Sequence, residues 1–156
     1  MPITIHPKVG QILLCNFSEG FKEPEMVKDK RPVIVISSAL QGRNKLVTVV
    51  PISSVKPDPI MPYHYVLPTA SLPMLGNFQE AESWVKGDML YTVAFHRLDL
   101  IRLGTRNSQG KRNYYQNRLG REQMKLIYSC VLHGLNIGNL AQHCYDSMKM
   151  SHSRTL

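Results

Sequence analysis

Cysteines, long apolar runs and clustered histidines are scarce in this chain of 156 residues. The three cysteines are odd in number and widely spaced, which argues against a disulfide framework. No stretch approaches the roughly 20 apolar residues of a membrane-spanning helix, so we expect no association with a membrane. The opening segment 1–8 lacks a cationic start followed by a long apolar run. We therefore expect no export signal and a cytoplasmic protein.

The histidines and cysteines of the sequence do not show the spacing of a metal site. The six histidines include no pair at the spacing of a zinc site, and the adjacent His143 and Cys144 match no recognised site. We predict a protein without a metal or other cofactor. The length fits one domain, which we expect over residues 1–139. The polar residues 140–156 predict a loosely ordered C-terminal tail.

Short apolar runs separated by turn residues predict a β-rich domain. Strands are expected over residues 11–17, 32–37, 46–52 and 63–67, with a strand pair or one bent strand across 82–95. Gly87 is the expected kink or bulge in that last segment. Three prolines make residues 56–62 a loop, and residues 18–30 form a long polar loop. This spacing of short runs is typical of a compact, mainly β barrel.

The hydrophobic period changes near the C-terminus. Apolar residues recur there at steps of three and four: Met124, Ile127, Tyr128, Val131, Leu132 and Leu135. This period predicts an amphipathic helix that begins near Gly120 and ends around Gly134 to Gly138. Its apolar stripe is expected to close the barrel or to pack at a subunit interface.

The net charge of +8 is concentrated in the second part of the chain. Residues 1–96 carry 9 Lys/Arg and 8 Asp/Glu, whereas residues 97–156 carry 10 and 3. No acidic residue lies between Leu100 and Arg121, and Tyr114 and Tyr115 stand among the cations. Cations attract phosphates and aromatic faces stack on bases, so this stretch predicts an RNA surface. The alternative is that residues 105–113 form only a solvated loop.

Two blocks combine an arginine and hydroxyls with apolar strands. Arg31-Pro32 opens one strand, and Ser53-Ser54 follows Val49-Val50-Pro51-Ile52 in the next. Arginine matches a phosphate edge with a planar fork of donors, and a serine hydroxyl adds a hydrogen bond beside it. The pair therefore favours a phosphate site. The alternative is a solvated charge before an edge strand and an ordinary turn.

The sequence resembles that of the PemK/MazF-like toxins in four segments that follow one another in the same order: Gly10–Phe17, Arg31–Ser37, Val49–Ser54 and Trp84–Val93. The resemblance runs from Gly10 to Leu98 and resumes weakly in the C-terminal helix. It implies a small SH3-like β-barrel that forms a homodimer, the toxin of a type II toxin–antitoxin pair. It further implies a sequence-specific, metal-independent ribonuclease for single-stranded RNA, which leaves 2′,3′-cyclic phosphate and 5′-hydroxyl ends and is neutralised by a cognate antitoxin.

The resemblance also implies roles for individual residues. Arg31 matches the family's catalytic arginine, and Ser53 stands where the family usually has threonine. Lys86-Gly87-Asp88 matches an Arg-x-Asp pattern, which makes Asp88 the candidate base and Lys86 the candidate acid, unless the two form only a surface turn. His64 and His96 fit no motif of the family but are further candidates, because imidazole titrates near neutrality. The expected RNA-binding residues are Ser54, His64, Lys28, Lys30, Arg102, Arg112 and Tyr114.

Two departures from the family pattern leave alternatives open. The loop over residues 21–30 is longer and more charged than is usual in the family, so it does not indicate which RNA sequence is cut or which antitoxin binds. The basic stretch 102–121 either extends the RNA path or binds an acidic antitoxin segment. A different class is a non-catalytic barrel that binds nucleic acid or poisons gyrase. The gyrase poisons use a C-terminal tryptophan, whereas the only tryptophan here is Trp84.

Overall fold

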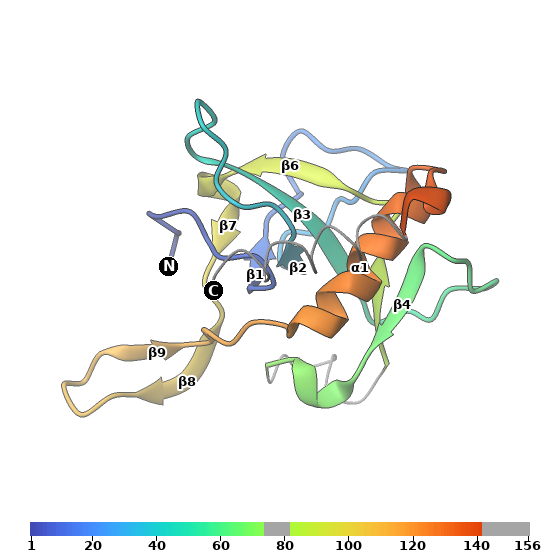
Figure 1. Cartoon of the computed structure of the whole chain (residues 1–156). Helices are drawn as coiled ribbons and strands as arrows, with labels where there is room; N and C mark the ends of the chain where they lie inside the picture. Colours follow the sequence, from blue (N-terminus) through green and yellow to red (C-terminus); the bar gives the residue numbers. More distant parts are fainter. Residues whose placement is uncertain (74–81, 142–156) are drawn as a thin grey trace, which may run out of the picture.

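The computed structural model describes residues 1–73 and 82–141 (Figure 1). Its strands are β1 (Ile12–Cys15), β2 (Arg31–Val35), β3 (Leu46–Ser53), β4 (His64–Leu67), β5 (Ser83–Lys86), β6 (Tyr91–Ala94), β7 (Leu98–Asp99), β8 (Arg102–Arg106) and β9 (Arg112–Tyr114). The helical elements within these residues are α1 (Arg121–Gly134) and the short 3₁₀ turns η1 (Thr69–Ser71), η3 (Phe95–Arg97) and η4 (Gly138–Leu140). None of the helices in the described ranges is both long enough and apolar enough to span a membrane.

One bent antiparallel sheet forms the body of the molecule. Its strands follow the order β4-β5-β3-β2-β1-β7, and β6 also pairs with β3. The long strand β3 bends so that its first half pairs with β6 and its last residues pair with β5. The predicted fold class, mainly β with a C-terminal helix, is confirmed. The sheet does not close into a barrel within the described residues, because β7 is only two residues long and pairs only with β1 and, through a single bridge, with Pro2.

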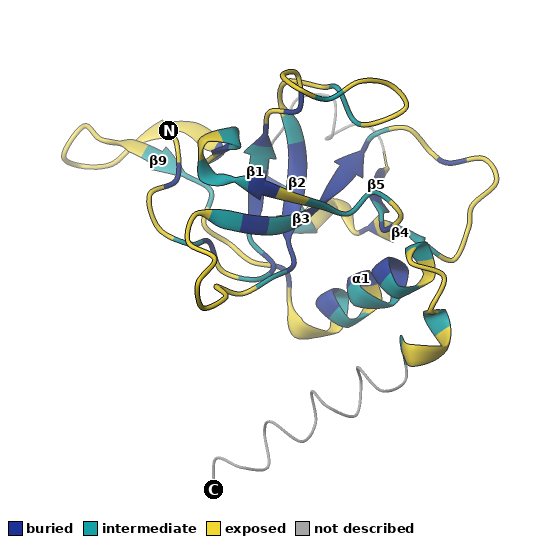
Figure 2. Cartoon of the chain, turned by 90° about the horizontal axis from the view of Figure 1, so that it is seen from above, coloured by how far each residue is buried: buried dark blue, intermediate teal, exposed yellow. Residues whose placement is uncertain are grey.

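Alternation along the strands divides the core between the two faces of the sheet. The even-numbered residues Ile12, Ile34, Val50 and Ile52 of β1, β2 and β3 face α1, as expected for a period of two. They meet the apolar stripe of the helix in one cluster, which includes Ile12, Ile34, Val50, Ile52, Met124, Ile127 and Val131. Odd-numbered residues form a second cluster on the other face, which includes Leu13, Cys15, Phe17, Val33, Val35 and Val49. Figure 2 shows this buried centre, with α1 lying along the sheet.

The C-terminal helix agrees closely with the sequence prediction. It begins at Arg121 after Gly120, whose N–H donates to the Gln123 side chain at 3.3 Å, and it ends at Gly134. Met124, Ile127 and Val131 of its stripe pack in the core, whereas Leu135, just after the helix, is 52% exposed. The segment 82–95 is a strand pair rather than one bent strand, since the chain turns after β5 and returns as β6. The tail predicted for residues 140–156 lies outside the described residues from 142 onward.

The stretch 102–114 forms an antiparallel hairpin of β8 and β9. It is therefore not the solvated loop that was the alternative for residues 105–113. The Asn107 side chain organises its tip, accepting hydrogen bonds from the N–H groups of Gln109 at 3.0 Å and Lys111 at 2.9 Å. Gly110 adopts a φ of 74°, which glycine tolerates without strain. Figure 1 shows the hairpin projecting from the body. Sequence alternation did not reveal it because both of its faces are largely polar.

Candidate nucleic-acid cleavage site

Arg31 and Ser53 stand at the ends of neighbouring strands. The register of β2 and β3 pairs Val33 with Pro51. Continued by two residues, this register sets Arg31 opposite Ser53. Directly opposite residues of an antiparallel pair project to the same face of the sheet. The Arg31 guanidinium also reaches the end of β3, where Nη1 donates to the Ile52 carbonyl at 3.4 Å. The structure therefore brings the two residues together.

The Arg31 side chain is only partly solvated. Its Nε is buried and has no hydrogen-bond partner. Burial lowers the pKa of Arg31 from its usual value, because removing water disfavours the charged form. A guanidinium that lacks part of its hydration binds an incoming anion more strongly than a fully solvated one does. This arginine is therefore well prepared to meet a phosphate.

The two serines after Pro51 differ in position. Ser53 is 8% exposed, and its Oγ accepts a hydrogen bond from the Val55 N–H at 3.2 Å. That bond leaves the hydroxyl hydrogen of Ser53 free to be donated. Ser54 follows the last residue of β3, is half-buried and lies outside the strand ladder.

Lys86 and His64 face each other across β5 and β4. Trp84 precedes Lys86 by two residues and pairs with Ser53, so Lys86 and Ser53 occupy the same face of the sheet. They are diagonal neighbours, for which the typical separation is about 7–8 Å. Lys86 and His64 thus extend the face that carries Arg31 and Ser53.

His64 is held in one neutral form. Its Nδ1 accepts a hydrogen bond from the Met61 N–H at 3.0 Å, so in the neutral ring the proton sits on Nε2. Burial lowers the pKa of His64, the nearby Lys86 charge lowers it further, and Asp88 opposes the shift. Protonation of Nδ1 would also break the bond to Met61. His64 is therefore suited to donate a hydrogen bond from Nε2 rather than to accept a proton.

Asp88 is exposed in the turn after β5, beside the end of α1. The turn is closed by the Met89 N–H, which donates to the Lys86 carbonyl at 3.1 Å. A Cβ added to Gly134 would lie 2.5 Å from the Gly87 carbonyl oxygen and 2.7 Å from the Asp88 Cα. Two glycines thus allow the helix to touch the backbone that carries Asp88.

The remaining predicted residues fall into two groups. Lys28 and Lys30 are exposed on the loop that leads into Arg31, and the Phe17 N–H donates to the Lys28 carbonyl at 3.0 Å. Arg102, Arg112 and Tyr114 lie on the hairpin, on the side of the molecule away from β4 and β5 (Figures 1 and 2). The hairpin residues of one chain therefore do not join the Arg31 site. His96, in η3, is exposed.

Sequence reasoning missed Trp84 as a member of this site. Trp84 pairs with Ser53 on one side and with Val66 on the other. Its indole Nε1 is buried without a hydrogen-bond partner, as is the Nε of Arg31. Two unpaired donors therefore flank Ser53. The two-residue step from Trp84 to Lys86 was the available signal, since it puts both side chains on one face.

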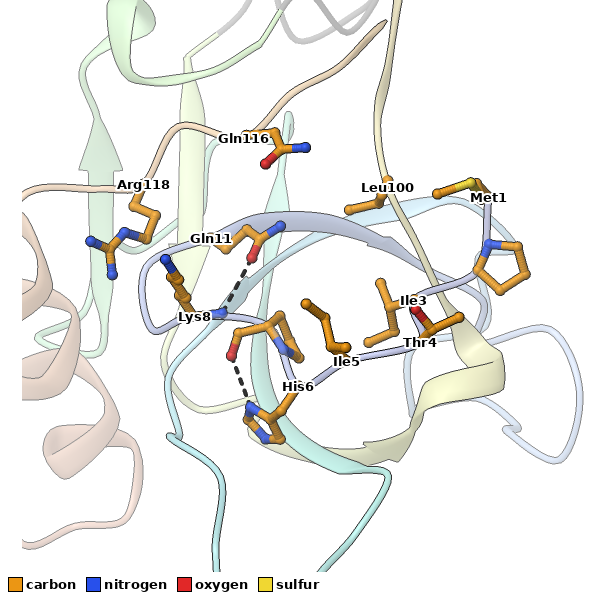
Figure 3. A pocket seen from close by; sticks show the side chains of 12 residues that line it. Met1, Ile3, Thr4, Ile5, His6, Lys8, Gln11, Leu100, Gln116 and Arg118 are labelled. Atoms are coloured by element: carbon orange, nitrogen blue, oxygen red, sulfur yellow. Dashed lines mark hydrogen bonds between the residues drawn. The ribbon is translucent and has the colours of Figure 1, made fainter. Parts of the chain in front are cut away.

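A separate cavity of about 410 Å³ lies between the N-terminal segment and the base of the hairpin (Figure 3). Its walls come from residues 1–8 with Gln11, Leu100, Gln116 and Arg118. None of Arg31, Ser53, Lys86 or Asp88 lines it. Among the described residues, no group of three or more His, Cys, Asp or Glu side chains gathers as metal ligands.

Comparison with known proteins places the chain in a family. The family described as PemK-like, MazF-like toxin of type II toxin-antitoxin system matches residues 8–131. The chain is 27% identical over 153 residues to the uncharacterized protein YifN of Escherichia coli strain K12, with 87% of this chain and 96% of that protein covered.

Two solved structures share the fold. One is an endoribonuclease in complex with its cognate antitoxin from a mycobacterial species, with 15% identity, a TM-score of 0.53, and 84% of this chain and 96% of that chain covered. The other is MazF from Deinococcus radiodurans, with 16% identity, a TM-score of 0.55, and coverage of 85% and 99%. Because the family match spans most of the sequence, this chain belongs to the PemK-like, MazF-like toxins of type II toxin–antitoxin systems.

Proposed function

We propose that this toxin is a sequence-specific, metal-independent endoribonuclease that cleaves single-stranded RNA. The ribose 2′-hydroxyl attacks the adjacent phosphate, and the products carry 2′,3′-cyclic phosphate and 5′-hydroxyl ends. The meeting of Arg31 and Ser53 at the ends of β2 and β3 carries this proposal. The family match supports it, as do two neighbours of the same fold that are an endoribonuclease and a MazF.

Arg31 and Ser53 hold the scissile phosphate in this proposal. The reaction adds negative charge to the phosphorane, and a fixed, partly desolvated guanidinium stabilises that charge more than it stabilises the ground state. Ser53 donates its free hydroxyl hydrogen to a phosphate oxygen, while Val55 holds the oxygen in place. Ser54 and the loop residues Lys28 and Lys30 contact the neighbouring nucleotides.

We assign the two proton transfers to Asp88 and Lys86, the residues on either side of Gly87. Asp88 removes the proton from the 2′-hydroxyl, and Lys86 delivers a proton to the departing 5′-oxygen. His64 donates from Nε2 to the RNA, because its Nδ1 is already engaged by Met61. Lysine is a point charge rather than a fork, so Lys86 positions the phosphate less rigidly than the arginine of other family members would.

An antitoxin and a second copy of the chain complete the proposal. The mycobacterial relative was solved with its cognate antitoxin, which supports an antitoxin for this chain as well. We propose that it covers Arg31 and so competes with RNA. We further propose a cytoplasmic homodimer with one toxin domain over residues 1–139.

The test is cleavage of single-stranded RNA by the purified protein in the presence of a chelator. The native protein is expected to cut and to leave cyclic-phosphate ends. Arg31→Ala is expected to slow cleavage by about 10²–10³-fold, the usual loss when one donor to a developing oxyanion is removed. Arg43→Ala is the matched control, because Arg43 is an exposed arginine in the loop between β2 and β3. It is expected to cut at the native rate.

Three results would count against the proposal. If Arg31→Ala cuts as fast as the native protein, Arg31 is not the catalytic arginine. If the chelator abolishes cleavage, the reaction depends on a metal. If the native protein shifts RNA in a gel and leaves it intact, the chain is a nucleic-acid-binding member of the fold without nuclease activity.

A further inference from the structure

The arm formed by β8 and β9, residues 102–114, lies apart from the cleavage site. Figures 1 and 2 show it on the side of the molecule opposite β4 and β5, the strands that carry His64 and Lys86. Residues 102–112 are all exposed. The arm is therefore too far from the Arg31 site of its own chain to hold the scissile phosphate of an RNA bound there.

The arm carries positive charge without a matching acid. Arg106 and Arg112 are direct cross-strand partners. Like charges in that arrangement repel and weaken a hairpin, so an external anion that neutralises them would stabilise it. Arg102 faces Tyr114 across the same pair of strands, which sets an aromatic ring beside a cation. No salt bridge within the described residues involves the arm.

The arm is held in a fixed shape despite this repulsion. Arg106 Nη1 donates to the Gly110 carbonyl at 2.7 Å, and Asn113 Nδ2 donates to Thr105 Oγ1 at 3.0 Å. Where the arm meets the body, the Tyr115 N–H donates to the Ile101 carbonyl at 2.9 Å. A preformed surface loses less conformational entropy on binding than a flexible loop does.

A hollow of about 150 Å³ opens on the arm. Its lining includes Arg102, Arg106 and Arg112 together with Thr105 and Asn113. We propose that this arm is a second, non-catalytic RNA-binding surface, whose arginines hold backbone phosphates away from the scissile bond. The proposal rests on the proposed function only in taking single-stranded RNA as the ligand.

The cavity of about 410 Å³ lies at the base of the arm, where Leu100, Gln116 and Arg118 contribute to its lining. Figure 3 shows Lys8, Gln11, Gln116 and Arg118 along one side of it, with Ile3, Ile5 and Leu100 on the other. Gln11 uses its side-chain oxygen to accept the Lys8 N–H at 3.2 Å, which leaves its amide hydrogens free. One wall can thus pack on a base while the other offers hydrogen bonds and positive charge. The cavity accepts one unstacked nucleotide from the strand that the arm holds.

The composition of the arm favours RNA over an acidic protein. Leu103 is the only aliphatic side chain between residues 102 and 114, whereas protein interfaces usually have an apolar core. Nucleic-acid interfaces are more polar and much more positive. The arm is likewise polar and positively charged, as nucleic-acid interfaces are.

The test measures binding of an uncleavable strand, single-stranded RNA with 2′-O-methyl riboses, at several salt concentrations. R106Q/R112Q removes the paired charges, and R43Q/K45Q removes two exposed charges from the loop between β2 and β3. Each lost phosphate contact on a single strand flattens the slope of log K against log salt by about 0.7. We expect R106Q/R112Q to flatten the slope by about 1.4 and to weaken binding about 25-fold near 0.1 M salt. R43Q/K45Q should match the native protein.

A charge-restoring variant guards against a change in the arm's shape. R106K/R112K is expected to recover the salt slope. Equal affinity and slope for R106Q/R112Q and R43Q/K45Q would overturn the proposal. So would a variant that keeps its RNA affinity but loses binding to an acidic peptide, since the arm would then be a protein-binding surface. Binding of this strand does not require cleavage, so an inactive protein would leave the result for the arm intact.

Discussion

Gly134→Ala tests whether the contact between α1 and the turn after β5 holds Asp88 in place. The new Cβ would lie 2.5 Å from the Gly87 carbonyl oxygen, whereas ordinary contacts begin at 3.4 Å. The helix end and the turn must therefore separate by about 0.9 Å, the difference between those distances. The atoms that the new Cβ would meet belong to the backbone of Gly87 and Asp88, which cannot swing aside as a side chain can.

The expected magnitudes separate stability from activity. Overpacking of this kind costs about 1–3 kcal/mol. Alanine offsets at most about 1 kcal/mol of this through its helix propensity, and less at the last residue of a helix. We expect a net loss of about 1–2 kcal/mol in the free energy of unfolding. A shift of nearly 1 Å in a group that transfers a proton lowers the rate by about 10²-fold.

The assay pairs urea unfolding with RNA cleavage at saturating substrate. Gly120→Ala is the control, because it makes the same substitution at the other end of α1, where a Cβ meets nothing within 4 Å. It removes a favoured helix-capping residue and so costs up to about 1 kcal/mol. The control is expected to keep the native cleavage rate in spite of that loss.

Two results would refute the reasoning about Gly134. If Gly134→Ala loses stability but cleaves at the native rate, Asp88 is not the proton acceptor. If it loses neither stability nor rate, the helix and the turn are not in the close contact described.

Two further predictions concern titratable groups. The pKa of His64 is lowered from 6.5 in the folded protein, so in mild acid the unfolded chain binds more protons than the folded one. The neutral His64 therefore contributes to the free energy of unfolding. That contribution is complete above pH 6.5 and is lost as the pH falls through the pKa of the folded protein. His64→Gln cannot titrate, so its unfolding free energy should fall less steeply in mild acid, and an unchanged pH profile would contradict the lowered pKa. Burial raises the pKa of Cys15 to about 12 and that of Cys130 to about 11, so both thiols stay protonated. In a Cys144→Ser variant, a thiolate-specific reagent should label neither until denaturant is added, and rapid labelling of the native protein would show that these thiols are accessible.

Parts of the candidate site followed from local sequence signals. Arg31 before an apolar strand and Ser53 at the end of the next were both visible as chemistry at strand ends. Their adjacency was not, because a shift of one residue in strand pairing would have sent one side chain to the other face. Only the observed register, Val33 with Pro51, decides it.

Other parts had no sequence signal strong enough to find them. The sequence predicted an RNA surface in this stretch but no strands, since β8 and β9 lack the apolar alternation that marks a strand. The neutral form of His64 depends on the backbone N–H of Met61, which no spacing rule anticipates. The contact of Gly87 with Gly134 joins residues far apart in the chain and appears only once α1 is docked.

The amino-acid sequence by itself determined the types of element and the chemistry available. The apolar periods of two and of three to four residues indicate most strands of the main sheet and the helix α1, because each of these elements must bury one face. The tertiary structure alone decided which functional groups meet, since strand register and helix docking result from packing the whole core at once. That packing sets Arg31 beside Ser53, turns His64 into a hydrogen-bond donor and carries the cationic arm to the far side of the molecule.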